Sequence, residues 1–276
     1  MPKIDSHVHF WQLARGDYYW MSPDLLALQR DFGAADFQTL RPANDIESIV
    51  LVQAAPTIEE TQFILQLAKD CDFVAAVIGK VDIETGSALE QLAVLKKEPL
   101  FRGIRPMLRD MRHNSWLRLP DLHDTLSCLE DAGLTFECML RPCQLATAIP
   151  VLQQHPRLHA VLSHGGMPHI SAGQYEQWAR GIRAIAKETT VDCKLSGLAT
   201  RAGEDWSGDA LRPYFDLLLR CFGPERLIWG SDWPVLLGVS TYTRWCNVCS
   251  ELLRELDDTE QRAIFHDNAR RFYRLM

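Results

Sequence analysis

The sequence predicts a (β/α)8 barrel, a closed ring of eight parallel strands in which a helix follows each strand. The chain has 276 residues, close to the roughly 250 residues of one such barrel. Short apolar runs alternate with amphipathic stretches along the whole chain. Their spacing leaves room each time for the crossover helix that a parallel pair of strands requires. We therefore expect one domain over residues 1–276, with a doubly wound open sheet as the alternative architecture.

Eight segments have the composition of buried strands. Several are nearly continuous apolar runs, as expected for strands that are covered on both faces. They occupy residues 2–7, 48–54, 73–79, 101–106, 134–140, 158–164, 190–196 and 226–232.

Helical patterns lie between these strands. Thr57 and Glu60 have the spacing of a capping box, which predicts a helix that continues to Asp70. Asp257 and Glu260 have the same spacing at the start of the C-terminal helices. The remaining amphipathic stretches cover 84–97, 121–132, 143–154, 174–188 and 209–222. No glycine-rich phosphate-binding motif follows any strand, which argues against a nucleotide-binding protein.

Composition and charge exclude several classes of protein and partner. The chain is 47% hydrophobic and 24% charged, which is typical of a globular protein rather than a disordered or fibrous one. Its formal net charge is −7, so we expect neither nucleic acid nor an anionic membrane as a partner. No apolar run approaches the ~20 residues of a membrane-spanning helix. A homo-oligomer is left open by the sequence.

The N-terminus and the cysteines predict a cytoplasmic protein with reduced thiols. The first residues, MPKIDSHVHFW, contain no apolar segment of the kind that secretory signals have. The chain has 8 cysteines, but a protein of this length can build its core without disulfides. Cys246 and Cys249 form a close pair within a helical pattern, and no second pair completes a zinc site. We expect two buried thiols there.

Ionisable residues end several predicted strands, where barrel enzymes carry their catalytic groups. His7 and His9 are two residues apart, so both imidazoles point to the same side of the first strand. The sixth strand ends at His164 and the eighth at Asp232. Because the first and last strands are neighbours in a closed barrel, His7, His9 and Asp232 should converge there and form a functional site.

Further residues near the strand ends are candidates for substrate contacts. Gln53 and Arg105 end the second and fourth strands. Trp11, Trp20 and Trp233 are close in the chain to the candidate site, where their rings could form an apolar wall over a ligand.

Six motifs together resemble the amidohydrolase superfamily. They are DSHVHFW at 5–11, LVQA at 51–54, GIRP at 103–106, LSHGGMP at 162–168, CKLSGL at 193–198 and WGSDWPV at 229–235. More narrowly, they resemble its barrel hydrolases that act on sugar lactones and pyrone dicarboxylate lactones. The resemblance continues to the terminal segment DNARRFYRL at 267–275. It implies an active-site core of His7, His9, His164 and Asp232, with Gln53, Arg105 and Trp233 as substrate contacts.

The resemblance also bears on metal content. Dinuclear members of the superfamily have a carboxylated lysine on strand 4 and a further histidine on strand 5, which this chain lacks. His7, His9 and Asp232, with or without His164, could instead hold one divalent ion, Zn or Mn. Equally, imidazolium groups and Arg105 could polarise a carbonyl without any metal. The chain departs from the family pattern at Ser163 and Met167, which affects the substrate more than the reaction.

These residues predict a lactonase that converts a cyclic ester into a hydroxy acid. Asp232 is expected to act as general base on water, and His7 and His9, or their metal, to stabilise the oxyanion. His164 would orient the water or the ring oxygen. The expected substrate is a small lactone, a sugar-acid lactone ahead of a dicarboxylate lactone. The alternatives are a metal-dependent decarboxylase with the same residues and a barrel that binds a ligand without catalysis.

Overall fold

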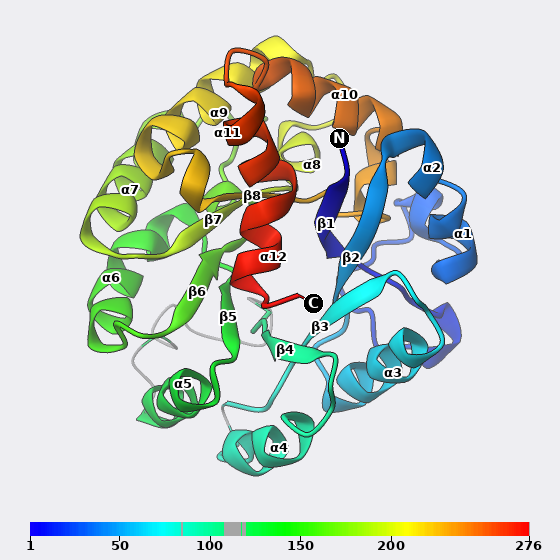
Figure 1. The fold of residues 1–276 in the computed structure, drawn as a ribbon, viewed down its shortest axis with the longest axis vertical. Coiled ribbons are helices and arrows are strands. Elements are labelled where there is room, and N and C mark those ends of the chain that lie inside the picture. The colour runs from blue at the N-terminus through cyan, green and yellow to red at the C-terminus, as the bar shows by residue number, and fades with distance from the viewer. Residues whose placement is uncertain (84, 108–116, 118–119, 276) are drawn as a thin grey trace.

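The structure, a computed structural model, describes residues 1–83, 85–107, 117 and 120–275. Eight parallel strands form one sheet in the order of the chain, from β1 to β8. Figure 1 shows these strands arranged around a common centre with the helices on the outside. The predicted single (β/α)8 barrel is confirmed.

The strands are short and almost wholly buried. The apolar runs predicted from the sequence overlap all eight and contain six of them, while β1 ends one residue later and β2 begins two residues earlier than predicted. They are β1 Lys3–Val8, β2 Ile46–Val52, β3 Val74–Gly79, β4 Phe101–Ile104, β5 Thr135–Cys138, β6 His159–Leu162, β7 Asp192–Leu195 and β8 Leu227–Trp229.

Four residues expected at strand ends lie beyond them. Gln53 and Arg105 follow the last residues of β2 and β4, and His164 and Asp232 lie in the segments after β6 and β8. The backbones of His164 and Asp232 are left-handed, with φ of 53° and 64°. A left-handed residue turns the chain away from the extended direction, so the strand has ended before each of these side chains is presented.

Helices follow the strands and surround the barrel (Figure 1). The long ones are α3 Ile58–Lys69, α4 Ala88–Leu95, α5 Pro120–Ala132, α6 Leu145–Gln154, α7 Tyr175–Glu188, α9 Gly208–Phe222 and α10 Tyr242–Leu252. Shorter helices are α1 Ala34–Gln38, α2 Arg41–Asn44, α8 Leu198–Ala202, α11 Asp258–Arg262 and α12 Asn268–Phe272. Among the described residues, no helix is both long and apolar enough to cross a membrane.

The two predicted capping boxes differ in outcome. Asp257 and Glu260 cap α11 reciprocally, as expected. At α3, the Thr57 hydroxyl accepts a hydrogen bond from the Glu60 amide, but the Glu60 carboxylate accepts one from the Ala54 amide at 2.8 Å instead of returning to Thr57. The first half of that box is therefore confirmed, and Glu60 holds the loop after β2.

The thiols of Cys246 and Cys249 are buried in α10, and both are free. The expectation of two buried thiols in a helix is therefore confirmed.

The ring closes through backbone bonds between β1 and the segment that follows β8. The Asp232 amide donates to the His7 carbonyl at 2.9 Å, and the His9 amide donates to the Trp233 carbonyl at 2.7 Å. Val8 and Trp233 form a parallel bridge between these bonds. Because β8 has only 3 residues, this closure continues the sheet at its carboxyl end and aligns the residues around His7 with Asp232.

Asp192, at the start of β7, provides a test of how burial affects stability. Burial raises the pKa of this carboxyl to about 7, although Arg271 and Arg226 act to lower it. Between about pH 4 and about pH 7 the folded protein keeps a proton on Asp192 that the unfolded chain loses near the ordinary aspartate pKa of about 3.9. The free energy of unfolding therefore falls as the pH rises from about 4 to about 7, and the whole of this loss is present above about pH 7.

Asp192→Asn is therefore expected to raise the midpoint of thermal unfolding, and to raise it more at about pH 8 than at about pH 5. The substitution also removes the ion pair between Asp192 and Arg271, whose charged atoms are 3.9 Å apart, but Arg271 is exposed. Losing this pair should therefore offset little of the increase in stability. The control is Asp70→Asn at an exposed helix end, for which we expect the same small change at both pH values. An equal shift for Asp192→Asn at both pH values would contradict the prediction.

Candidate active site

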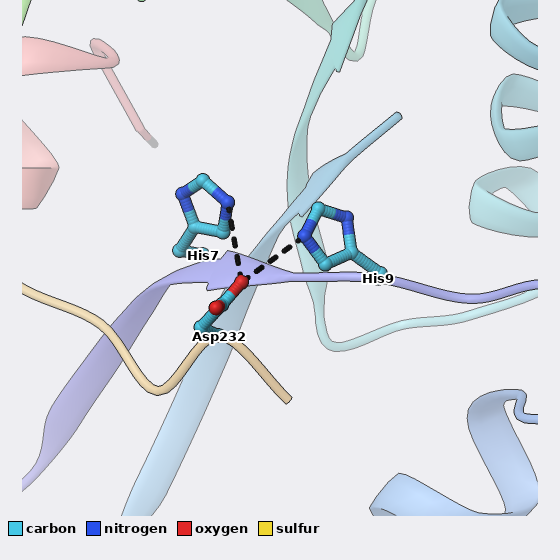
Figure 2. A group of neighbouring side chains, drawn as sticks. All are labelled: His7, His9 and Asp232. Carbon is cyan, nitrogen blue, oxygen red and sulfur yellow. Dashed lines mark ion pairs between the residues drawn. The ribbon is translucent and has the colours of Figure 1, made fainter. Parts of the chain in front are cut away.

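His7, His9 and Asp232 lie together at the carboxyl end of the barrel, as predicted. Figure 2 shows both imidazoles directed at the Asp232 carboxylate. Asp232 Oδ1 is 3.3 Å from His9 Nε2 and 3.7 Å from His7 Nε2. All three residues are buried, so their charges and lone pairs interact in a poorly solvated environment.

Asp5 fixes the backbone on which these residues stand. Its Oδ1 accepts hydrogen bonds from the His7 amide at 3.1 Å and the Ser231 amide at 2.8 Å. Its Oδ2 accepts the Tyr242 hydroxyl at 2.8 Å. One buried carboxylate therefore joins β1, the loop after β8 and α10. Burial raises its pKa to about 6, although these hydrogen bonds act to lower it.

The ring of His9 is oriented by a backbone carbonyl. Its Nδ1 lies 2.7 Å from the Val52 carbonyl oxygen, and because that oxygen can only accept, Nδ1 carries the proton. The lone pair is therefore on Nε2, which points at Asp232. The ligand atoms of His7, His9 and Asp232 lie within 4.8 Å of one another. Two imidazoles and a carboxylate in this arrangement fit one divalent ion, with His9 held as metal-ligating histidines usually are.

Arg105 and Gln53 support the site from the neighbouring strands. Arg105 Nη1 is 3.0 Å from His7 Nε2, and Nη2 donates to the Gln53 carbonyl. The Gln53 amide group donates to the Arg105 carbonyl at 2.7 Å. Both residues are buried. Gln53 thus fixes Arg105, and Arg105 carries a positive charge beside His7.

His164 completes the cluster. Its ring centroid lies 4.5 Å from that of His7, and its Nδ1 is 3.0 Å from the Ser196 hydroxyl. A left-handed turn after β6 brings this side chain over the barrel opening. The prediction that His164 joins the other three residues agrees with its position.

Burial sets the ionisation of the cluster. It lowers the pKa of His7 well below its ordinary value, lowers that of His9, and lowers that of His164 to about 4. Burial alone would raise the pKa of Asp232, but the nearby His164, His9 and Arg105 outweigh it and lower that pKa. Near neutral pH the imidazoles are neutral and the carboxylate is charged, which favours metal-ligating imidazoles over the imidazolium arrangement.

A cavity of about 490 Å3 opens above the cluster. Five of the predicted site residues line it, namely His9, Trp20, Arg105, His164 and Asp232. The Trp20 indole donates to the Ala54 carbonyl at 2.7 Å, which holds it at the rim. His7 and Gln53 are fully buried among the groups described above.

Trp11 and Trp233 belong to an aromatic core beside the cavity. Both pack edge to face on Phe32, and Trp233 also packs on Phe37. The Trp11 indole donates to the Arg30 carbonyl at 2.8 Å. Neither residue is among the described residues that line the cavity, and Trp11 packs against Trp20 with the ring centroids 5.7 Å apart.

The other lining residues were not among the predicted site residues, and most of them come from loops, apart from Thr200 and Arg201 in α8. They are Ala54, Met107, Met139, Arg141, Met167, His169, Gly197, Thr200, Arg201 and Val235. Position after a strand end was the available signal for most of them. Asp232 is the one carboxylate among the described lining residues.

Comparison with known proteins places the chain in a family. Residues 4–275 match the family described as Amidohydrolase, so the chain belongs to that family, and the predicted resemblance is confirmed. A crystal structure of an amidohydrolase from Burkholderia multivorans with bound Zn is 29% identical, with a TM-score of 0.93 over 100% of both chains.

Two curated relatives are similar over nearly their whole length. The L-fucono-1,5-lactonase of Burkholderia ambifaria is 37% identical over 99% of this chain and 96% of its own. The L-fucono-1,5-lactonase of Burkholderia multivorans is 30% identical over the same shares.

Removing the Tyr242 hydroxyl tests how much its hydrogen bond to Asp5 contributes to stability. Tyr242→Phe removes the donor to Asp5 Oδ2 at a buried position, which should cost about 1–3 kcal/mol of unfolding free energy. Urea denaturation measures that loss. In the control, Tyr175→Phe removes an exposed hydroxyl that is 3.4 Å from the Pro213 carbonyl, and should cost less than about 0.5 kcal/mol. Equal costs for the two variants would show that the bond to Asp5 is not important for stability.

Proposed function

We propose that the protein is a lactonase that opens the ring of a sugar-acid lactone. The carrying observation is the convergence of Asp232 with His7, His9 and His164 at the base of a cavity, in a chain 37% identical to an L-fucono-1,5-lactonase. A lactone carbonyl needs one electrophile and one base, and the site offers both.

Asp232 acts as the general base. Its carboxylate is ionised and lines the cavity, although little of it is accessible to bulk solvent. It can therefore accept a proton from a water molecule that attacks the lactone carbonyl. The ring C–O bond then breaks, and Asp232 returns the proton to the leaving alkoxide. The product is a hydroxy acid, which releases one proton when its new carboxyl group ionises.

The surrounding residues bind and orient the substrate. Arg105, held by Gln53, directs its guanidinium toward the oxyanion or a ring hydroxyl. His164, fixed by Ser196, orients the attacking water. Trp20 covers one face of the ring. A divalent ion, Zn or Mn, held by His7, His9 and Asp232 would supply a Lewis acid that polarises the carbonyl.

A lactone panel with a pH indicator tests the proposal. The panel includes L-fucono-1,5-lactone, other six-carbon sugar lactones and a dicarboxylate lactone. The enzyme is used both metal-stripped and reconstituted with Zn or Mn. We expect acid release from at least one sugar lactone, and a loss of rate on stripping that the ion restores. If no lactone releases acid under either condition, the proposal is wrong, and release of CO2 from a carboxylated substrate would identify a decarboxylase instead.

Asp232→Asn separates catalysis from folding. Asparagine tolerates the left-handed backbone that Asp232 adopts, so the thermal midpoint should change little. Without the base, kcat should fall about 10²–10⁴-fold. The control is Asp124→Asn, an exposed position on α5, which should keep the rate of the natural protein. Near-normal turnover by Asp232→Asn would remove this residue from the mechanism.

A further inference from the structure

A chain of buried polar side chains lies directly beneath His7, inside the barrel. It consists of Glu137 on β5, Lys194 on β7 and Tyr273, the residue after α12. None of the three is exposed. Polar groups are costly at such a place unless they are satisfied, so their arrangement requires an explanation.

The two oxygens of the Glu137 carboxylate have different surroundings. Oε1 accepts hydrogen bonds from Lys194 Nζ and from the Tyr273 hydroxyl, both at 2.7 Å. Oε2 has no hydrogen-bond partner among the described residues, and it lies 3.9 Å from His7 Nδ1. A buried carboxylate oxygen left without a donor destabilises the folded state. His7 Nδ1 is a potential donor to this oxygen.

The other side of the His7 ring shows where its proton is. Arg105 Nη1 lies 3.0 Å from Nε2, and a guanidinium can only donate. If Nε2 accepts this bond, a neutral ring carries its proton on Nδ1, on the side of Glu137. The opposite tautomer would direct two N–H groups at each other and leave Glu137 Oε2 without a donor.

Lys194 is the competitor for Nδ1. Its Nζ lies 3.1 Å from that atom, but it also donates to the Ser6 carbonyl at 2.8 Å and to Glu137 Oε1. A bond from Lys194 to Nδ1 would require the opposite tautomer, and an ammonium has three donors, so its other two bonds do not exclude it. The buried Glu137 Oε2, which has no other donor among the described residues, is what favours the proton on Nδ1. A closer approach of about 1 Å between the ring and the carboxylate would make the Nδ1–H to Oε2 hydrogen bond.

We propose that Glu137 is a positioning residue that accepts the Nδ1 proton of His7. The bond fixes the ring and keeps the Nε2 lone pair directed at Arg105, Asp232 and any ion held there. Carboxylates behind metal-ligating histidines commonly have this effect. Lys194 balances the charge of Glu137, and both Lys194 and Tyr273 donate to Oε1, which leaves Oε2 free to accept from His7. The inference rests on the proposed function only in placing His7 in the active site.

Nitrogen NMR of histidine-labelled, metal-free protein tests the proposal, with the His7 signals assigned from the His7→Gln spectrum. We expect the proton on Nδ1 in the natural protein. Glu137→Gln should move it to Nε2, weaken zinc binding about 10–100-fold and lower kcat more than it raises KM. Zinc affinity is measured by competition with a chelating dye, without substrate.

Tyr273→Phe is the matched control. It removes the Tyr273 hydroxyl that donates to Glu137 Oε1 but keeps the carboxylate. The thermal midpoint should therefore fall, while the His7 tautomer and the zinc affinity stay unchanged. A purely structural role for Glu137 predicts that both variants lower the midpoint and that neither moves the proton.

Glu137→Gln leaves the Lys194 ammonium buried without its counter-ion, and this variant can fail to fold. The double variant Glu137→Gln with Lys194→Met removes that charge. It also removes the competing donor at Nδ1, so its readout is zinc affinity, and the same loss of affinity is expected in it. A proton on Nε2 in the natural protein, an unchanged tautomer in the folded Glu137→Gln variant, or a double variant that binds zinc as tightly as the natural protein overturns the proposal. Because these readouts need no lactone, a negative substrate screen would leave this test valid.

Discussion

The closure of the barrel at Asp5 is the constraint on which the site depends. The strand β8 has 3 residues, and the last contacts of the ring are made beyond it. The Asp5 carboxylate joins the His7 and Ser231 amides and the Tyr242 hydroxyl. These bonds tie β1 to the segment after β8 and therefore set the position of His7 relative to Asp232. The closed barrel and the assembled site depend on the same contacts.

Burial then decides the chemistry of the assembled residues. Low solvation keeps the three imidazoles neutral, whereas the charged Arg105 nearby helps keep Asp232 ionised. A neutral imidazole with a lone pair can ligate an ion, and an ionised carboxylate can accept a proton. In water an imidazole has a pKa of about 6.5 and is partly protonated near neutral pH, so burial makes the neutral form that can ligate an ion more complete.

Much of the fold and the centre of the site could be predicted from the sequence. Strand and helix patterns are local, and eight alternations permit few closed arrangements. The convergence of His7, His9 and Asp232 follows from barrel geometry alone. The positions of Trp11 and Trp233 do not, because proximity in the chain leaves open which side of a turn a ring occupies. The lining of the cavity comes from loops, whose course depends on tertiary contacts rather than on periodicity.

The polar interior below His7 connects the two ends of the chain. The strand that carries His7 begins at Lys3, and Tyr273 near the C-terminus reaches the same interior through Glu137. A barrel of this kind is stable with an apolar interior, and a buried ion pair is seldom a gain in stability over apolar packing. The pair Glu137 and Lys194 is better explained by what it touches. Both side chains approach His7 Nδ1, so the polar interior supports the active site from below, while Asp5 supports it at the seam of the barrel.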